Sequence, residues 1–327
     1  MKLNLEPNKS KVSQLVEALS SAISKGVYKA GETLPSIRVL SAKYNLSRDT
    51  VYKAYQELRE KGIVESTPTK GYFVFNRVKN IFVLLDIFTP YKEDLYNELT
   101  SKLHEDYNVD LFFHHYNERS YNNMILDSIG RYDLYLITNF QNDVYSKVLD
   151  RLDNTKVLLL DLGKFKKDKF SYVCQGFDST LYNCLMSGLD KLKKYSELYF
   201  FIHEKSEHPK SCLPYFVSFC VDNGFKYNIR TKDIKEIDIQ PNRAYLISRH
   251  KDLVDFVKIC RKKDLEIGED VGVITFNDAP MLEIIENGIS VITTDFKMMG
   301  SCAAEFVVSN KKIQTYIPTK LILRGSL

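Results

Sequence analysis

The chain has 327 residues, of which 44% are apolar and 27% charged, which predicts two or three globular domains and excludes a disordered chain. The net charge of +4 is unevenly distributed, because residues 1–76 hold twelve Lys or Arg and seven Asp or Glu, a balance of +5, which leaves −1 for the rest. A basic module on a near-neutral body indicates a polyanionic partner for that module, although a solvated basic face would have the same composition.

No apolar run is long enough to span a bilayer, and the first ten residues lack the apolar core of a signal peptide. None of the six cysteines has the two-residue spacing of a zinc or redox motif, so free thiols in a reducing compartment are expected. These features predict a soluble cytoplasmic protein without a metal, a cofactor or a membrane partner.

The first 76 residues contain the pattern of three helices followed by a β-hairpin. Apolar residues recur at helical spacing over 9–25, and a short second helix is predicted over 36–43 after Pro35. Ser47 is a good N-cap for a third helix, which ends near Gly62. Two short strands, at 63–65 and 72–75, are predicted to flank a turn.

From Asn80 onward, short apolar runs alternate with amphipathic segments. Strands are predicted at 81–87, 109–113, 134–138 and 157–160, and a second series at 198–202, 225–229, 244–247 and 271–276. Helices are predicted at 92–105, 120–129, 143–152, 179–193, 212–223, 252–263 and 281–288. This alternation predicts an α/β fold with parallel sheets covered by helices on both faces, and two series in tandem predict two lobes. The expected divisions are residues 1–76, a linker at 77–80 and a two-lobed domain at 81–327.

Four motifs follow one another in the N-terminal region: GETLPSIRVL at 31–40, SRDTVYKAY at 47–55, KGI at 61–63 and GYFV at 71–74. This long ordered set resembles the GntR family of winged-helix regulators, and the resemblance covers residues 9 to about 76. It implies that the first domain is a winged helix-turn-helix that binds double-stranded DNA.

A helix that begins at Ser47 places Arg48, Thr50 and Tyr52 on its first turn and a half. In a helix-turn-helix this end enters the major groove, where an arginine can make a bidentate contact to guanine. The resemblance assigns DNA contacts to Arg38, Ser47, Arg48, Thr50 and Gly71, and the wing tip adds Lys70. The predicted DNA-binding residues are Arg38, Ser47, Arg48, Thr50, Tyr52, Lys70 and Gly71. Val51, Ala54 and Tyr55 are expected in the core. Asp49 is an acidic residue on a surface that is otherwise expected to be purely basic or polar.

The second region carries another ordered set of motifs, at 244–252, 270–280 and 289–300, and it ends in the pattern P-x-x-L-x-x-R-x-S at 318–326. The set resembles the lactose-repressor-like regulators, whose sensor has the fold of periplasmic sugar-binding proteins. Together with the N-terminal motifs, it is similar to the arabinose-repressor subgroup. The resemblance implies a monosaccharide effector such as a pentose or deoxyhexose.

Ligands of doubly wound sheets bind beyond the carboxyl ends of the strands, where polar side chains can pair with sugar hydroxyls and aromatic rings can cover a sugar face. The resemblance implies contacts at Asn277, where the family usually has Asp, and at Arg249, where it usually has Asn or Asp. Asp178 is either a ligand contact or a helix cap. Lys210, with His208 second, is the candidate for the family's ligand arginine. The predicted ligand-binding residues are Phe88, Tyr91, Asp178, Lys210, Arg249 and Asn277.

These expectations combine into a homodimeric repressor that binds a palindromic operator and is released when a small sugar binds between the two lobes. A sugar-dependent activator would use the same parts. An α/β enzyme fused to a DNA reader is a weaker alternative, because the sequence lacks a glycine-rich phosphate loop, a nucleophile elbow and a metal-binding cluster.

Overall fold

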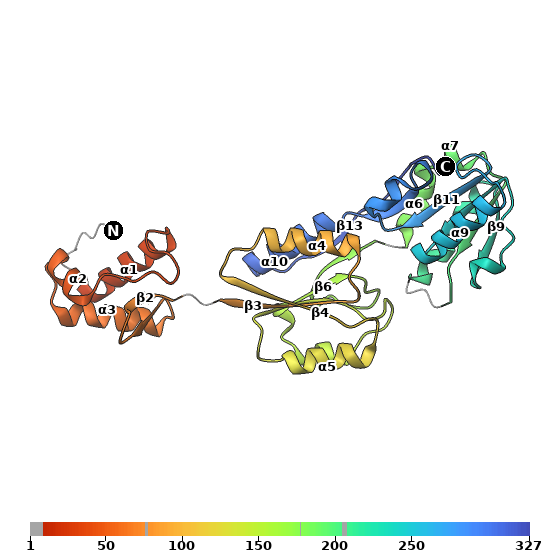
Figure 1. Cartoon of the computed structure of the whole chain (residues 1–327). Coiled ribbons are helices and arrows are strands. Elements are labelled where there is room, and N and C mark those ends of the chain that lie inside the picture. Colours follow the sequence, from red (N-terminus) through yellow and green to blue (C-terminus); the bar gives the residue numbers. More distant parts are fainter. Residues whose placement is uncertain (1–8, 76–77, 177, 205–207) are drawn as a thin grey trace. The chain divides into compact units, whose positions relative to one another are not determined.

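The computed structural model describes residues 9–75, 78–176, 178–204 and 208–327. The chain divides into two compact units, residues 1–78 and 79–327, and each is described by itself (Figure 1). Residue 77 of the expected linker lies outside the described residues, while Lys79 and Asn80 belong to the first strand of the second unit rather than to a linker. None of the described helices has both the length and the apolar character needed to cross a membrane.

The N-terminal unit contains three helices and a two-stranded antiparallel hairpin, in the predicted order. Its elements are α1 (Lys11–Ser24), α2 (Ile37–Tyr44), α3 (Arg48–Glu60), β1 (Val64–Thr67) and β2 (Gly71–Val74). Their apolar faces form one core, in which Val51, Ala54 and Tyr55 are fully buried, as predicted. The Tyr55 ring stacks on Tyr72 of the hairpin at 4.3 Å, and its hydroxyl donates a hydrogen bond to the Pro35 carbonyl. Tyr55 therefore fixes α3 to both the hairpin and the start of α2.

The second unit contains two six-stranded sheets that define two lobes (Figure 1). The first-lobe sheet is entirely parallel, in the order β13-β7-β6-β5-β3-β4. Its strands are β3 (Lys79–Leu85), β4 (Tyr107–Phe113), β5 (Leu134–Thr138), β6 (Val157–Asp161), β7 (Ser171–Gln175) and β13 (Gln314–Ile317). The second-lobe sheet, in the order β14-β12-β11-β10-β8-β9, is parallel except for its edge strand β14. Its strands are β8 (Glu197–Phe201), β9 (Lys226–Arg230), β10 (Arg243–Ile247), β11 (Val271–Phe276), β12 (Ser290–Thr294) and β14 (Thr319–Ile322).

Helices cover both faces of each sheet, so the central strands are buried on both sides, as parallel sheets require, while the edge strands β4, β9, β13 and β14 are partly exposed. The first lobe has α4 (Pro90–Ser101), α5 (Glu118–Ser128) and α10 (Phe296–Ser309). The second lobe has α6 (Ser179–Ser187), α7 (Leu189–Leu192), α8 (Leu213–Asp222) and α9 (His250–Lys262). In Figure 1, α4 and α10 lie together on one face of the first sheet and α5 lies on the other. The predicted two-lobed α/β fold is confirmed.

The chain passes between the two sheets three times: after β7, after β12 and between β13 and β14. Because of this, α10 and β13, which follow strands of the second lobe, complete the first lobe. Gly300 of α10 makes the packing on α4 possible, since a Cβ at this position would lie 2.4 Å from the Leu95 carbonyl oxygen.

Two of the predicted helices are wrong. Residues 143–152 contain only the short 3₁₀ turn Lys147–Arg151, preceded by a loop in which the Asn139 side chain donates to the carbonyls of Gln141 and Val144. Side-chain bonds of this kind compete with helical ones. Residues 281–288 form two 3₁₀ turns, Pro280–Glu283 and Ile285–Asn287, because Glu286 has a positive φ of 51° that interrupts a helix.

Candidate functional site

The first turn of α3 is held by a hydroxyl pair at its N-terminus. Ser47 is the N-cap, and its Oγ accepts a hydrogen bond from the Thr50 backbone nitrogen at 3.0 Å. The two hydroxyl oxygens, Ser47 Oγ and Thr50 Oγ1, lie 2.7 Å apart. Before the cap, Asn45 adopts the left-handed conformation that ends α2, and Ser41 Oγ bonds the Leu46 carbonyl. The turn between α2 and α3 is thus specified by short polar side chains.

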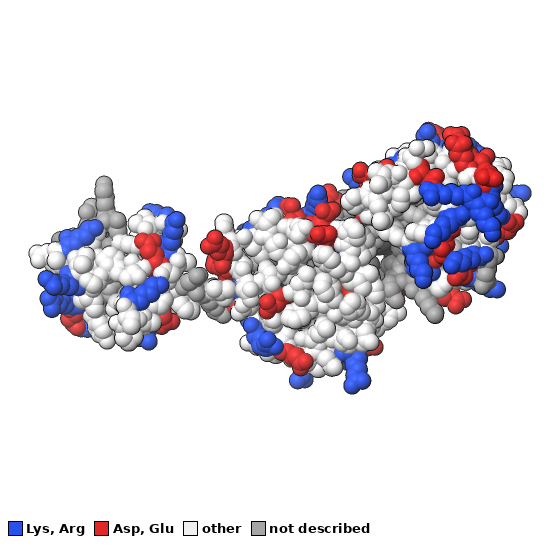
Figure 2. All heavy atoms as spheres, viewed as in Figure 1, with Lys and Arg blue, Asp and Glu red and all other residues white. Residues whose placement is uncertain are grey.

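The outer face of the same helix is exposed and carries the predicted DNA-binding side chains. Arg48 is exposed, and Tyr52 is 48% exposed although it is a large aromatic residue. Arg38, on the preceding helix α2, is exposed as well. Asp49 forms an ion pair with Lys53 at 2.8 Å, so this acidic side chain offsets a neighbouring lysine instead of standing alone. Figure 2 shows Lys and Arg side chains gathered around α2 on the face in view.

The tip of the hairpin differs from a freely extended wing. Gly71 has a φ of 72°, which a side chain would disfavour. Lys70 Nζ bonds the Gly31 carbonyl oxygen at 2.7 Å and lies 4.6 Å from the centre of the Phe73 ring. The Lys70 ammonium is therefore folded back onto its own domain.

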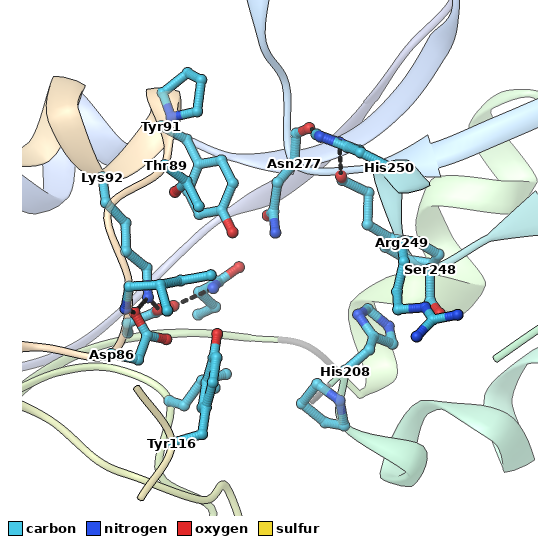
Figure 3. A pocket seen from close by; sticks show the side chains of 17 residues that line it. Asp86, Thr89, Tyr91, Lys92, Tyr116, His208, Ser248, Arg249, His250 and Asn277 are labelled. Atoms are coloured by element: carbon cyan, nitrogen blue, oxygen red, sulfur yellow. Dashed lines mark hydrogen bonds and ion pairs between the residues drawn. The ribbon is translucent and has the colours of Figure 1, made fainter. Parts of the chain in front are cut away.

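A cavity of about 320 Å³ lies in the second unit and is lined by both lobes. The first lobe contributes side chains at or just after the carboxyl ends of β3, β4, β6 and β7, and the second contributes those at or after the carboxyl ends of β8, β10 and β11. Figure 3 shows the two sets facing each other across the opening. The lining residues are Asp86, Ile87, Thr89, Pro90, Tyr91, Lys92, Tyr116, Asp161, Leu162, Gln175, His208, Pro209, Ser248, Arg249, His250, Phe276 and Asn277. This is the ligand position that a doubly wound sheet provides.

On the side of the first lobe, the cavity is lined by a buried ionic triad of Lys92, Asp86 and Asp161. Lys92 is 2% exposed, and its Nζ contacts Asp86 and lies 3.0 Å from Asp161 Oδ2. Burial opposes the charged form, but the two carboxylates outweigh it and hold the pKa of Lys92 above its ordinary value. Gln175 donates a hydrogen bond to Asp161 Oδ1, so both oxygens of this carboxylate have a partner. The hydrogen bonding of Asp86 is less complete than that of Asp161, because no donor among the described residues is in hydrogen-bond geometry with its buried Oδ2.

Tyr116 reaches the cavity through an unusual turn after β4. His115 and Tyr116 both have positive φ, 51° and 57°, and His114 Nδ1 accepts a hydrogen bond from the Tyr116 backbone nitrogen at 3.1 Å. Because His114 Nε2 faces the Thr138 carbonyl oxygen, this ring is neutral with its proton on Nε2. Burial lowers the pKa of His114 to about 4. Burial and then Asp86 raise the pKa of Tyr116, so its hydroxyl remains a neutral donor pointing toward Asp86 (Figure 3).

The second-lobe wall is polar but electrically balanced. Arg249 makes a two-pronged contact with Asp252, with Nε to Oδ2 at 2.6 Å and Nη2 to Oδ1 at 2.7 Å. His250 Nε2 lies 3.0 Å from the Phe276 carbonyl oxygen, and Asn277 has a φ of 60° that aims its side chain into the opening. Burial lowers the pKa of His208 to about 3, so this imidazole is neutral.

Three of the predicted ligand residues, Tyr91, Arg249 and Asn277, line this cavity, and three do not. Phe88 is 52% exposed and packs edge-on against Phe113. Asp178 forms an ion pair with Lys164 and accepts a hydrogen bond from Ser211 Oγ. Its side chain makes no capping hydrogen bond to α6. Lys210 lines an adjoining cavity of about 250 Å³, to which Tyr116 and His208 also contribute.

The sequence reasoning missed Asp86, Lys92, Tyr116 and Asp161. A signal was present for the two aspartates, since each stands at the end of an otherwise apolar strand, where a charge has a structural or binding reason to be. The described residues contain no group of three or more His, Cys, Asp or Glu side chains arranged to hold a metal ion.

Two family models match the chain: "Bacterial regulatory proteins, gntR family" over residues 11–74 and "Periplasmic binding protein-like domain" over residues 215–327. The HTH-type transcriptional repressor YtrA of Bacillus subtilis is 33% identical over 70 residues, 21% of this chain and 54% of YtrA. A probable fructoselysine utilization operon transcriptional repressor of Escherichia coli is 34% identical over 76 residues, 23% of this chain and 31% of that protein. The chain thus spans about half or less of the length of these two curated relatives.

Solved structures match over most of the chain at low identity. The trehalose repressor of Escherichia coli has a TM-score of 0.64 at 11% identity, covering 75% of this chain and 100% of that one. A LacI family transcriptional regulator of Lactobacillus casei with bound sucrose has a TM-score of 0.62 at 13% identity, covering 76% and 100%. At these identities the likeness shows the fold. The chain therefore combines a winged helix-turn-helix unit that matches the gntR family model with a two-lobed, periplasmic-binding-protein-like domain that has the same fold as these solved regulators.

Proposed function

We propose that this protein is a sequence-specific transcription regulator, a repressor that leaves its operator when a small sugar binds between the two lobes. The observation that carries the proposal is one chain with both an exposed, well-capped α3 and a polar cavity lined by two lobes. Arg38, Arg48 and Tyr52 would read base edges and phosphates, with Ser47 and Thr50 holding the end of the helix. Tyr91, Arg249 and Asn277 would contact the sugar.

Release of DNA would follow from a population shift of the two lobes. A sugar that contacts both walls favours the arrangement in which both contacts are made, and it shifts the equilibrium only by its differential affinity for that arrangement. Three short segments of the chain connect the lobes. A change in the conformation of these segments would therefore move one whole sheet relative to the other.

The proposal includes a homodimer on a palindromic operator. Its support is an apolar surface on the second lobe, where Val254, Met281 and Ile284 are 48%, 56% and 83% exposed. Val254 and Met281 also line a cavity of about 230 Å³ with Leu253, Val257 and Leu282, and His250, Lys258 and Arg261 contribute to its lining. Exposed apolar surface of this kind is typical of an interface, and two-fold symmetry would place two α3 helices on successive turns of the duplex.

The test begins with selection of a binding site from a random duplex pool, followed by fluorescence anisotropy with the selected site. Arg48→Ala is expected to weaken specific binding by about ten- to a hundredfold, the value of a lost bidentate base contact. Asp49→Asn, on the same exposed turn, is the matched control and is expected to retain binding. Adding sugars to the complex should then release the DNA. Failure to select any site, or equal binding by Arg48→Ala, would refute the DNA-reading role, and a sugar that strengthens binding would indicate the opposite sign of control.

A further inference from the structure

We infer that the cavity selects an uncharged, hydroxyl-bearing ligand that donates a hydrogen bond to Asp86, and that it rejects phosphorylated forms of the same sugars. This inference rests on the proposed function and specifies its ligand class. It follows from three features of the cavity: the number of charges that line it, the incompletely hydrogen-bonded Oδ2 of Asp86 and the carboxylate already paired with each cation.

The first-lobe wall carries a net negative charge. Two carboxylates, Asp86 and Asp161, share one lysine, and all three side chains are at most 4% exposed. Such buried charges are screened little by solvent, so the uncompensated carboxylate acts strongly on whatever binds beside it.

Of the two carboxylates, Asp86 is the one that can accept a further hydrogen bond. Its Oδ1 accepts hydrogen bonds from Lys92 and from the Ile87 backbone nitrogen, the latter at 2.7 Å. Its buried Oδ2 has the Tyr116 hydroxyl directed toward it, but no donor among the described residues meets it in good hydrogen-bond geometry. A buried acceptor without a well-formed hydrogen bond is costly, and a ligand hydroxyl that donates to it removes that cost. Asp161 offers no comparable opening, because Gln175 and Lys92 occupy its two oxygens.

The described cations of the lining are each held by a carboxylate. Lys92 is paired with Asp86 and Asp161. Arg249 is bound by both oxygens of Asp252, whose side chain is only 4% exposed. The adjoining cavity includes Lys210, but Asp143 and Glu204 line it as well. A phosphate group carries about −1.5 to −2 charges at neutral pH. Among the described lining side chains it would meet only cations already paired with a carboxylate, and near Asp86 it would be repelled.

The test measures binding to the full-length protein by isothermal titration calorimetry with matched pairs: ribose and ribose 5-phosphate, arabinose and arabinose 5-phosphate, glucose and glucose 6-phosphate. At least one neutral sugar is expected to bind, and its phosphate to bind about a hundredfold more weakly, from repulsion across roughly 5 Å at an intermediate dielectric. A phosphate that binds as tightly as its parent sugar would overturn the inference and leave sugar sensing intact. If neither class binds, sugar sensing itself fails, and the inference with it.

Asp86→Asn separates charge from shape. This variant keeps an acceptor but removes the net negative charge, so the preference for the neutral member of a pair is expected to fall at least tenfold. Asp127→Asn makes the same substitution on the exposed face of α5 and should leave the preference unchanged. Thermal unfolding of both variants monitors folding. An unaltered preference in a folded Asp86→Asn protein would contradict the assignment of Asp86.

Discussion

Replacing Lys92 with methionine would leave two carboxylates, Asp86 and Asp161, facing each other in a buried site with no cation between them. Because Lys92 Nζ lies 3.0 Å from Asp161 and contacts Asp86, the carboxylates would be roughly 5 Å apart. Their repulsion is then about 3 kcal/mol at an effective dielectric constant of 20. Removing one member of a buried ion pair costs about 3–5 kcal/mol in general. We therefore expect Lys92→Met to lower the free energy of unfolding by about 3–5 kcal/mol at pH 8.

The pH dependence makes this prediction specific. In the folded variant, uptake of one proton by the carboxylate pair relieves the repulsion, whereas the unfolded chain has no such pair. The folded state therefore binds more protons at mildly acidic pH, and the loss of stability should be smaller at pH 5 than at pH 8. Since the chain has no tryptophan, urea unfolding is best followed by circular dichroism.

Two further variants complete the experiment. Lys102→Met removes an exposed lysine that pairs with Glu98 on α4, and it should cost no more than about 0.5 kcal/mol. Adding Asp161→Asn to Lys92→Met should recover most of the loss, because one of the two charges is gone. A loss below about 1 kcal/mol at pH 8, or an equal loss at both pH values, would refute the reasoning.

Two other predictions concern packing and titration. Gly300→Ala should lower the free energy of unfolding by about 1–3 kcal/mol, because its Cβ would meet the backbone of α4. Gly188→Ala should cost less, since its one close contact is with the flexible end of the Leu321 side chain. Equal losses for the two variants in urea titrations would contradict this. His114 should lower stability as the pH falls from about 6.5 to about 4, because burial keeps it neutral in the folded state while the unfolded chain takes up the proton first. His114→Gln should reduce this acid slope by up to about 1.4 kcal/mol per pH unit, and an unchanged slope would exclude His114 as its source.

The sequence predicted the fold well where local signals and burial agree. Capping by Ser47 and the alternation of apolar runs gave α3 and most of the strands within two residues of their observed bounds. It failed where the conformation depends on contacts distant in sequence. The loop after Asn139 and the turns around Glu286 have helical composition, but side-chain hydrogen bonds and a positive φ prevent helices there. The passage of α10 back to the first lobe could not be derived from periodicity.

The candidate site was predicted in part for a related reason. Tyr91, Arg249 and Asn277 were accessible to reasoning because they follow strands and have polar or aromatic side chains suited to sugars. The triad escaped because Asp86, Lys92 and Asp161 become one unit only when β3, α4 and β6 are brought together. Tyr116 depends on two successive left-handed residues and on the His114 ring, none of which a strand pattern indicates.

The return of the last strands to both sheets has a consequence for biosynthesis. Residues 314–317 supply the edge of the first sheet, and residues 319–322 supply the edge of the second. On a ribosome, the N-terminal unit can fold as soon as its hairpin emerges, whereas neither lobe can close its sheet until these final segments have been made. Nascent chains would therefore carry a folded winged helix well before either lobe of the second unit is complete.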